Sequence, residues 1–402
     1  MEKLKTFQPG RIGPLTLKNR LVRSATFEYM GTETGEVNTP LVNLYRNLAK
    51  GGVGLIITGF ASVHPEAYLH PQQMRIHDDC FIDGLQRIPD AVHKLDNGCR
   101  IFLQLTHAGR QQVSPELVDW VVAPSAVYDE LFMRTPRELS FQEIEEIVIC
   151  FAESIRRAKD AHFDGVQLHA GHGWLLSSFL SPRTNKRKDA YGGTTENRVR
   201  IFKEIFNLAR NMVGDDFPIL IKMSSKDYLP GGMNLDEGKR VAQQLSKIGF
   251  SALEISGGMW EAMTRDEKEL GWKPVPLPEA RVDILTKDQE AYFWEDAKAI
   301  QKVVETPIIL VGGLRSLEIV EKVLEEGSVD FCSMARPFIR EPDFPNKWLA
   351  GKEKGKSKCI SCNLCMPAPE KFLECRVGQE HDEEEALEIF PYLKKRYSEK
   401  NS

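Results

Sequence analysis

Short apolar runs alternate with longer amphipathic stretches along most of the chain. The runs are rich in Val, Ile and Leu, and eight of them lie at 21–26, 54–58, 101–105, 165–170, 219–223, 252–256, 308–312 and 330–335. Runs of this kind, each followed by a stretch with helical spacing, are typical of parallel strands joined by crossover helices. Eight strands can close a sheet on itself, so the pattern predicts an α/β fold, a (β/α)8 TIM barrel.

The intervening stretches show helix signals at their ends. Residues 141–161 place apolar side chains at helical spacing, Ser140 stands before them as an N-cap, and Glu143 follows three residues later. A second helix is predicted from Thr195 to Gly214, where the glycine ends it, and a third over 235–249. Each is long enough to return the chain for a right-handed parallel crossover.

Two segments interrupt this alternation, and both follow a predicted strand. Residues 106–139 and 257–289 are too long for ordinary connections, and they lie on the side of a barrel where active sites are built. The barrel pattern ends near residue 345. We therefore expect a barrel domain over 1–345 and a short cysteine-rich C-terminal segment with a charged tail over 346–402.

Composition excludes several classes of protein. The 53 basic and 58 acidic residues give a formal charge of −5, which does not favour a nucleic-acid-binding or acidic-membrane-binding protein. The N-terminal residues contain no apolar leader, and no run of about 18 apolar residues occurs. We expect a cytoplasmic protein with no membrane span and no nucleic-acid partner.

The eight cysteines fall into two groups. Cys359, Cys362, Cys365 and Cys375 crowd into one short segment, and four thiolates at this spacing predict a metal site, either a 4Fe-4S cluster or a structural zinc ion, with unmetallated thiols as the alternative. The other four, at positions 80, 99, 150 and 332, are expected to be buried as small apolar side chains.

A phosphate group is expected at the last two strands. The chain has no G-x-G-x-x-G after any predicted strand, so the dinucleotide fingerprint is missing. Barrels often bind phosphate with the loops after strands seven and eight. Here these loops contain Gly312, Gly313 and Arg336, which offer close backbone approach and a charge-assisted contact, although the glycines also suit a simple turn.

Two further strands end in chemistry-bearing side chains. His169 and His172 stand at the end of the fourth strand. They are either satisfied polar groups of a loop or a functional pair, which suits carbonyl or anion recognition better than metal binding, because no third ligand is evident nearby. Lys222 lies inside the fifth strand, and a buried ammonium needs a partner. That partner is an electron-rich ligand, an anionic cofactor ring, or an acidic side chain inside the barrel.

Four segments resemble the old yellow enzyme family of FMN-dependent ene reductases. They are TLKNRLVRSAT near the start, LQLTHAGR after the third strand, HAGHGWLLSSFLSPRTNKRKDAYGG after the fourth and SMARPF after the eighth. The C-terminal CISCNLC is similar to the branch that includes 2,4-dienoyl-CoA reductase and trimethylamine dehydrogenase. The resemblance covers roughly residues 4–375 and implies an FMN-dependent oxidoreductase that takes hydride from NADH or NADPH in a ping-pong cycle.

The resemblance also assigns roles residue by residue. His169 and His172 would bind the electron-withdrawing group of the substrate, and Lys222 would stabilise reduced flavin. The remaining flavin-binding positions that it implies are Ala25, Thr26, Phe27, Gly59 and Gln104 at the ring, and Gly312, Gly313, Ala335 and Arg336 at the phosphate. In the dienoyl-CoA reductase branch, a cluster at the cysteines relays electrons to the flavin, although its spacing there is longer.

One departure affects the reaction. Many family members have a proton-donating tyrosine two residues after the second of the paired positions, whereas this chain has Trp174, and an indole is not a practical acid. Tyr29 or water then supplies the proton, or the natural reaction needs no donor. We expect reduction of an activated alkene such as an enone or enoyl compound.

Two alternatives to this reduction remain. One is an FMN and iron-sulfur dehydrogenase, and the other is an electron-transfer subunit that passes electrons to a partner protein. The resemblance also leads us to expect assembly into a homo-oligomer.

Overall fold

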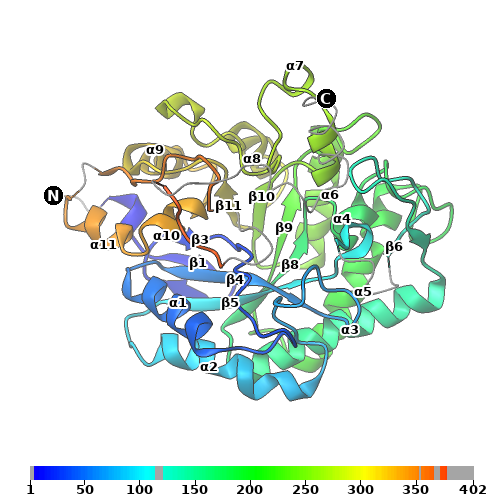
Figure 1. The fold of residues 1–402 in the computed structure, drawn as a ribbon, viewed down its shortest axis with the longest axis horizontal. Coiled ribbons are helices and arrows are strands. Elements are labelled where there is room, and N and C mark those ends of the chain that lie inside the picture. The colour runs from blue at the N-terminus through cyan, green and yellow to red at the C-terminus, as the bar shows by residue number, and fades with distance from the viewer. Residues whose placement is uncertain (1–3, 114–120, 353–354, 366–371, 378–402) are drawn as a thin grey trace, which may run out of the picture.

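The computed structural model describes residues 4–113, 121–352, 355–365 and 372–377. Within them, eight parallel strands close into a barrel in chain order, and helices surround it (Figure 1). The predicted TIM barrel is confirmed. Its strands are β3 (Leu21–Arg23), β4 (Leu55–Ser62), β5 (Arg100–Thr106), β8 (Gly165–Ala170), β9 (Ile219–Ser224), β10 (Leu253–Ser256), β11 (Ile308–Val311) and β12 (Phe331–Met334).

The strand bounds differ from the prediction by more than one residue at two places. Strand β3 ends at Arg23 rather than at residue 26, and the segment that follows it turns into the mouth of the barrel. Strand β4 is longer than expected and runs to Ser62, with a register shift between Ile57 and Phe60 where it pairs with β5. A bulge of this kind lets a strand redirect its side chains near a site.

Helices connect successive strands as predicted. The crossover helices are α1 (Thr39–Lys50), α2 (Ile82–His93), α3 (Phe141–Asp160), α5 (Thr195–Val213), α6 (Leu235–Ile248), α8 (Trp294–Gln301) and α9 (Leu317–Glu326), and α10 (Arg336–Arg340) and α11 (Phe344–Leu349) follow β12. Ser140 and Glu143 form the expected capping box at the start of α3. Gly214 ends α5 with a positive φ of 73°.

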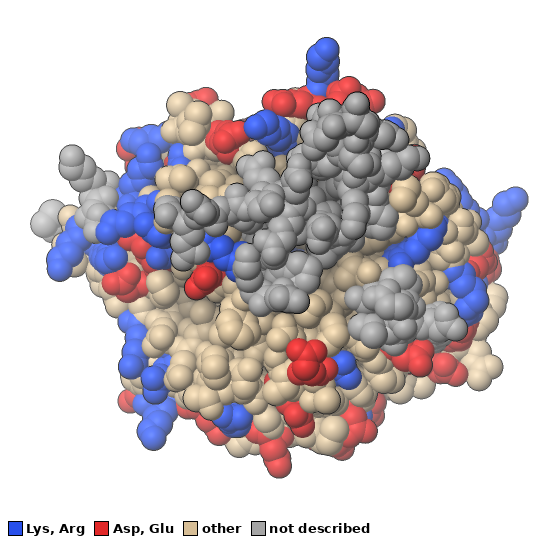
Figure 2. Space-filling view, in the orientation of Figure 1, with Lys and Arg blue, Asp and Glu red and all other residues tan. Residues whose placement is uncertain are grey.

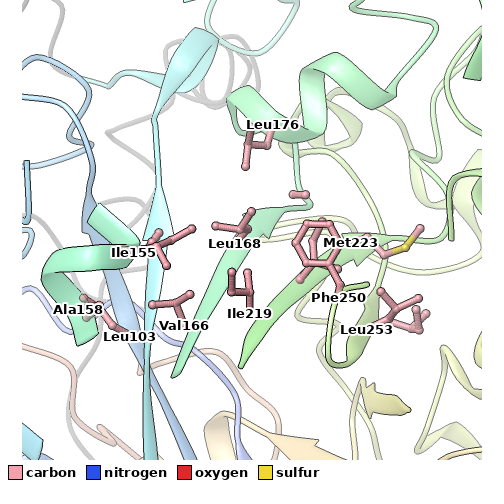
Figure 3. Packing of buried hydrophobic residues seen from close by; sticks show 14 of the residues in the cluster. Leu103, Ile155, Ala158, Val166, Leu168, Leu176, Ile219, Met223, Phe250 and Leu253 are labelled. Carbon is pink, nitrogen blue, oxygen red and sulfur yellow. The ribbon is translucent and has the colours of Figure 1, made fainter. Parts of the chain in front are cut away.

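The core between strands and helices is apolar. Figure 3 shows Ile155 and Ala158 of α3 beside Leu103 of β5 and Val166 of β8, and all four side chains are fully buried. These strand residues face outward, because side chains alternate between the two faces of a strand.

The barrel interior changes from apolar to polar along its strands. At the N-terminal ends, Phe102, Leu220 and Phe331 belong to a buried apolar cluster, and the two-stranded hairpin of β1 (Gly10–Ile12) and β2 (Leu15–Leu17) packs into it. Two residues further along each strand, Gln104, Lys222 and Ser333 face the same interior, since side chains repeat with a period of two. The polar layer therefore lies next to the C-terminal ends of the strands.

The two long insertions contain short elements of their own. Residues 106–139 include the 3-10 turn η3 (Gly109–Gln111) and the paired strands β6 (Val122–Ala123) and β7 (Arg137–Glu138), and 257–289 include η4 (Trp260–Thr264), α7 (Glu267–Leu270) and η5 (Lys287–Gln289). The remaining short elements are η1 (Lys5–Phe7), η2 (Asp79–Phe81) and α4 (Leu175–Leu180). Among the scattered cysteines, Cys99 and Cys332 are buried and Cys150 is half-buried, whereas Cys80 is exposed in η2, so burial was a wrong prediction for Cys80.

The visible surface carries charges of both signs. Lys and Arg side chains alternate with Asp and Glu around the rim of the face in Figure 2. No helix among the described residues is long and apolar enough to span a membrane. The division into two domains near residue 345 stays a prediction.

Candidate active site

A cavity opens at the C-terminal ends of the barrel strands. Its empty space, which includes open solvent at the mouth, is ≈ 1340 Å³. Most of the predicted site residues line it: Ala25, Thr26, Phe27, Tyr29, Gln104, His169, His172, Lys222, Gly312, Gly313, Ala335 and Arg336. Gly59 does not line it, and of the four clustered cysteines only Cys365 does.

His169 and His172 lie together on one wall of this cavity. Their ring centroids are 5.1 Å apart with the ring planes at 86°, and each residue is 5% exposed. Burial lowers the pKa of both imidazoles well below 6.5, and the nearby Lys222 charge adds to this effect. Both rings are therefore neutral at pH 7.

Backbone contacts fix the donor group of His169 and the conformation of His172. The Gly171 N–H donates to Nδ1 of His169 over 3.4 Å, so the proton of the neutral ring is assigned to Nε2. In His172, Nε2 lies 2.8 Å from Ser256 Oγ, and the backbone has a φ of 64°. The Gln111 side-chain amide and the Trp260 backbone N–H both donate to the His172 carbonyl. These two bonds hold the unusual backbone conformation of His172.

Lys222 has an acidic partner beneath it. Its Nζ donates to Ser24 Oγ over 2.9 Å and lies 3.5 Å from Glu254 Oε1, and Glu254 is 0% exposed. The two residues are register partners on β9 and β10. The lysine therefore has an ion pair inside the barrel, and it also lines the cavity.

Glu254 connects the residues of the polar layer. Its Oε1 accepts hydrogen bonds from Ser24 and Ser333 hydroxyls at 2.7 and 2.8 Å, and its Oε2 accepts one from Gln167 Nε2 at 2.7 Å. Gln167 Oε1 in turn accepts from Gln104 Nε2 at 2.7 Å. This chain of bonds orients the Gln104 amide at the floor of the cavity.

The segment after β3 is held by a buried carboxylate. Glu28 accepts hydrogen bonds from Arg23 at 3.1 Å, from the Gly59 N–H at 2.8 Å, and from the Tyr45 hydroxyl. A Cβ at Gly59 would lie 2.6 Å from the Thr26 carbonyl oxygen and would also overlap the Glu28 carboxylate. Gly59 thus allows β4 to approach the Thr26 segment, and the predicted direct flavin contact of Gly59 stays a prediction.

Aromatic rings form the wall beside this segment. Phe27 packs on Phe60 and Tyr29 with centroid distances of 4.8 and 3.9 Å. Burial raises the pKa of the Tyr29 phenol above 10, so the hydroxyl is neutral. Trp174, 1% exposed, packs between Phe60 and Trp260 at 5.0 and 5.2 Å.

The loops after β11 and β12 form the wall on the other side of β3, next to it in the barrel. Gly312 and Gly313 have φ values of 129° and 71°, which L side chains rarely adopt. Arg336 donates from Nη1 to Asn363 Oδ1 at 2.7 Å and to the Arg281 carbonyl at 2.8 Å. The arginine at the expected phosphate site is thus positioned by the C-terminal segment.

The four clustered thiols lie near one another in the C-terminal segment. Burial raises the pKa of Cys365 to about 12, with the other three thiols reinforcing the shift and Arg336 opposing it. Arg340 Nη1 lies 3.5 Å from Cys375 Sγ. The thiol set suits iron or zinc chemically, but the described residues hold no group of three or more His, Cys, Asp or Glu side chains placed to hold a metal ion. Metal binding stays a prediction.

Sequence reasoning missed two acidic residues of this site, Glu254 and Glu279. Glu279 comes from the insertion after β10, lines the cavity, and places Oε1 3.8 Å from His172 Nδ1. No periodicity in that insertion marks it. Glu254 had a signal, because a charged residue in an apolar strand next to Lys222 in register is a natural ion-pair partner.

Comparison with known proteins yields a family and several relatives. A family model described as the NADH:flavin oxidoreductase / NADH oxidase family matches residues 5–354. An NADH oxidase of Thermoanaerobacter brockii is 38% identical over 361 residues, which are 89% of this chain and 52% of the relative. The chain thus spans about half the length of that relative.

Solved structures give the same result. A 2-naphthoyl-CoA reductase in complex with 2-naphthoyl-CoA matches with a TM-score of 0.82 and 25% identity over 96% of this chain and 58% of the other. An old yellow enzyme homologue from Zymomonas mobilis matches with a TM-score of 0.73 and 26% identity, over 88% of this chain and 94% of the other. The resemblance stated from the sequence motifs is confirmed.

Proposed function

Because the chain belongs to the NADH:flavin oxidoreductase / NADH oxidase family, we propose that it is an FMN-dependent enzyme that uses NADH or NADPH to reduce an activated alkene. The observation that supports this most is the composition of one cavity. It brings the two neutral histidines, Lys222, and the glycine and arginine loops after β11 and β12 together at the barrel mouth.

The residues of the cavity suit FMN. The Gly312–Gly313 backbone and Arg336 would hold the phosphate, as such loops do in other barrels. Ala25, Thr26, Phe27 and Gln104 would line the ring, with Ala335 beside the phosphate loops. Bound FMN would supply hydride transfer from a reduced nicotinamide to an acceptor. Lys222 would place a positive charge beside the ring, and Glu254 keeps that ammonium in position.

His169 and His172 would bind the acceptor. A neutral imidazole donates one hydrogen bond without adding a net charge, and the Nε2–H of His169 is such a donor. Donation to a carbonyl oxygen stabilises the negative charge that develops there during reduction, which is worth a factor of about 10²–10³ per donor in comparable sites. Tyr29 remains a candidate for proton transfer on the other wall.

The test is an anaerobic visible spectrum of the purified protein. We expect flavin bands that bleach on addition of NADH or NADPH and return on addition of an enone or an enoyl-CoA ester. Protein made in a flavin-replete host without bound flavin contradicts the proposal. Flavin that neither nicotinamide reduces contradicts the direction of electron flow.

Two positions offer a matched pair of variants for the histidine role. His172 and His162 have φ values of 64° and 65°, so glycine fits the backbone at both. His172→Gly should lower kcat/KM for the enone by about 10²–10³ with flavin content unchanged. His162→Gly, at an exposed turn before β8, should leave it within twofold.

A second candidate function is a dehydrogenase or electron-transfer subunit that passes electrons through the cysteine segment to a partner protein. Cys365 lines the same cavity as the proposed flavin site, which supports this reading. Iron, acid-labile sulfide and zinc analysis of wild type, Cys365→Ser and the exposed control Cys80→Ser tests it. Metal lost in Cys365→Ser alone supports a site at the cysteines, whereas a wild type without metal contradicts it.

A further inference from the structure

Glu279 projects into the cavity beside the histidine pair. Its Oε1 accepts a hydrogen bond from the Trp260 indole at 3.1 Å and lies 3.8 Å from His172 Nδ1. Its backbone carbonyl accepts the Tyr292 hydroxyl at 2.7 Å, which fixes this part of the insertion. The Oε2 atom is buried and has no hydrogen-bond partner among the described residues.

Burial and nearby charges act in opposite directions on the pKa of the Glu279 carboxyl. Burial raises the pKa of the Glu279 carboxyl above 4.5, while the Trp260 N–H and the charge of Lys222 oppose this shift. The titratable groups that face it are His172, Lys222 and Tyr292. The imidazole is neutral, and the ammonium is already paired with Glu254. A carboxyl that keeps its proton is an O–H donor, and the Glu279 side chain lines the cavity.

The other candidate proton donors at the cavity, Trp174 and Tyr29, are weaker acids than a carboxyl group. Trp174 occupies the position where the family resemblance places a tyrosine, and its indole does not release a proton in this pH range. Tyr29 packs against Phe27 and His70, and burial raises the pKa of its phenol above 10. A carboxyl group is the stronger acid, and it lies next to the histidines that would bind the acceptor.

We propose that Glu279 is the general acid that protonates the α-carbon of an alkene whose electron-withdrawing group is bound by His169 and His172. This inference rests on the proposed function. Hydride from the reduced donor forms the new bond at the β-carbon, and the π electron pair of the alkene forms a bond at the α-carbon to the Glu279 proton. The product is saturated, and the Glu279 carboxylate regains a proton from solvent.

The experiment separates the two half-reactions by stopped-flow absorbance. In Glu279→Gln, flavin reduction by NADH or NADPH should keep its wild-type rate, and reoxidation by ferricyanide should also be unchanged because it needs no carbon protonation. Reoxidation by an enone should be at least about 100-fold slower, the usual contribution of a general acid. Glu267→Gln, an exposed glutamate on α7 of the same insertion, is the matched control and should behave as wild type.

A pH profile and an infrared spectrum test whether Glu279 carries the proton that is transferred. In wild type, the enone rate should fall as pH rises through the Glu279 pKa, and Glu279→Gln should lose this limb of the profile. The infrared difference spectrum of wild type minus Glu279→Gln should contain a carboxylic-acid C=O band at pH values below the midpoint of that profile and lose it above.

Each adverse result overturns a definite part of the argument. Enone reoxidation at the wild-type rate in Glu279→Gln, or no carboxylic-acid band, overturns the role of Glu279. A loss of 100-fold in Tyr29→Phe with none in Glu279→Gln assigns the proton to Tyr29 instead. A wild type that reacts with nicotinamides but with no enone overturns the proposed function, and the role of Glu279 with it.

Discussion

Neutralising Glu254 tests whether the polar layer of the barrel is stabilised by charge. This carboxylate accepts three hydrogen bonds of 2.7–2.8 Å and lies 3.5 Å from the Lys222 ammonium, with no exposed surface. Replacement by Gln keeps the shape of the side chain. It removes the counter-charge of Lys222 and turns an N–H donor toward either Gln167 Nε2 or the two serine hydroxyls.

The size of the effect follows from this geometry. Removing one partner of a buried ion pair costs about 3–5 kcal/mol, because the other charge stays buried without compensation. We therefore expect Glu254→Gln to lower the free energy of unfolding by about 3–5 kcal/mol, a large part of the roughly 5–15 kcal/mol typical of a folded protein. Lys222→Met should cost a similar amount for the converse reason.

The assay is a double-mutant cycle by urea unfolding without added ligands. Each single variant leaves one uncompensated charge, whereas the double variant leaves none, so the double loss should be smaller than the sum by at least about 1 kcal/mol. Glu269→Gln on the exposed surface of α7 is the control and should lie within about 0.5 kcal/mol of wild type. A Glu254→Gln variant as stable as that control, or strictly additive losses, would refute the reasoning.

Three other substitutions have definite expectations. Gly59→Ala should destabilise the protein by about 1–3 kcal/mol in thermal or urea unfolding, because the added Cβ overlaps the Glu28 carboxylate, and unchanged stability contradicts the close approach. Ser140→Ala should cost about 0.5–2 kcal/mol by removing the cap of α3, measured in the same way. The Asp164 hydrogen bond raises the pKa of His93. His93→Gln should therefore be less stable than wild type by the full amount below pH 6.5, and this difference should disappear as pH rises through the raised pKa. A difference that grows with pH contradicts this last expectation.

The sequence predicts the fold to the level of individual strands, because the period of apolar residues differs between strands and helices. The same pattern misses the β1–β2 hairpin, since strands of three residues are too short to show a period. It also places the end of β3 three residues too late, because Ser24, Ala25 and Thr26 fit a strand in sequence but line the cavity instead of pairing in the barrel.

The candidate site is predictable where its residues lie on strands. His169 and Lys222 belong to β8 and β9, so their position at the mouth follows from the barrel itself. Glu279 lies in a 33-residue insertion after β10 whose path depends on tertiary contacts with Trp260 and Tyr292. Nothing local in the sequence places such a residue, and only the structure brings the Glu279 carboxyl beside His172.

The hairpin at the N-terminal end of the barrel has a kinetic consequence. Ile12 and Leu17 are fully buried in the apolar interior cluster, so this end of the barrel is sealed by side chains. Under the proposed function, a nicotinamide and an acceptor would both have to enter through the opposite opening and take turns in it. Excess of either compound should slow turnover by occupying the space the other needs, and the two should compete as dead-end inhibitors.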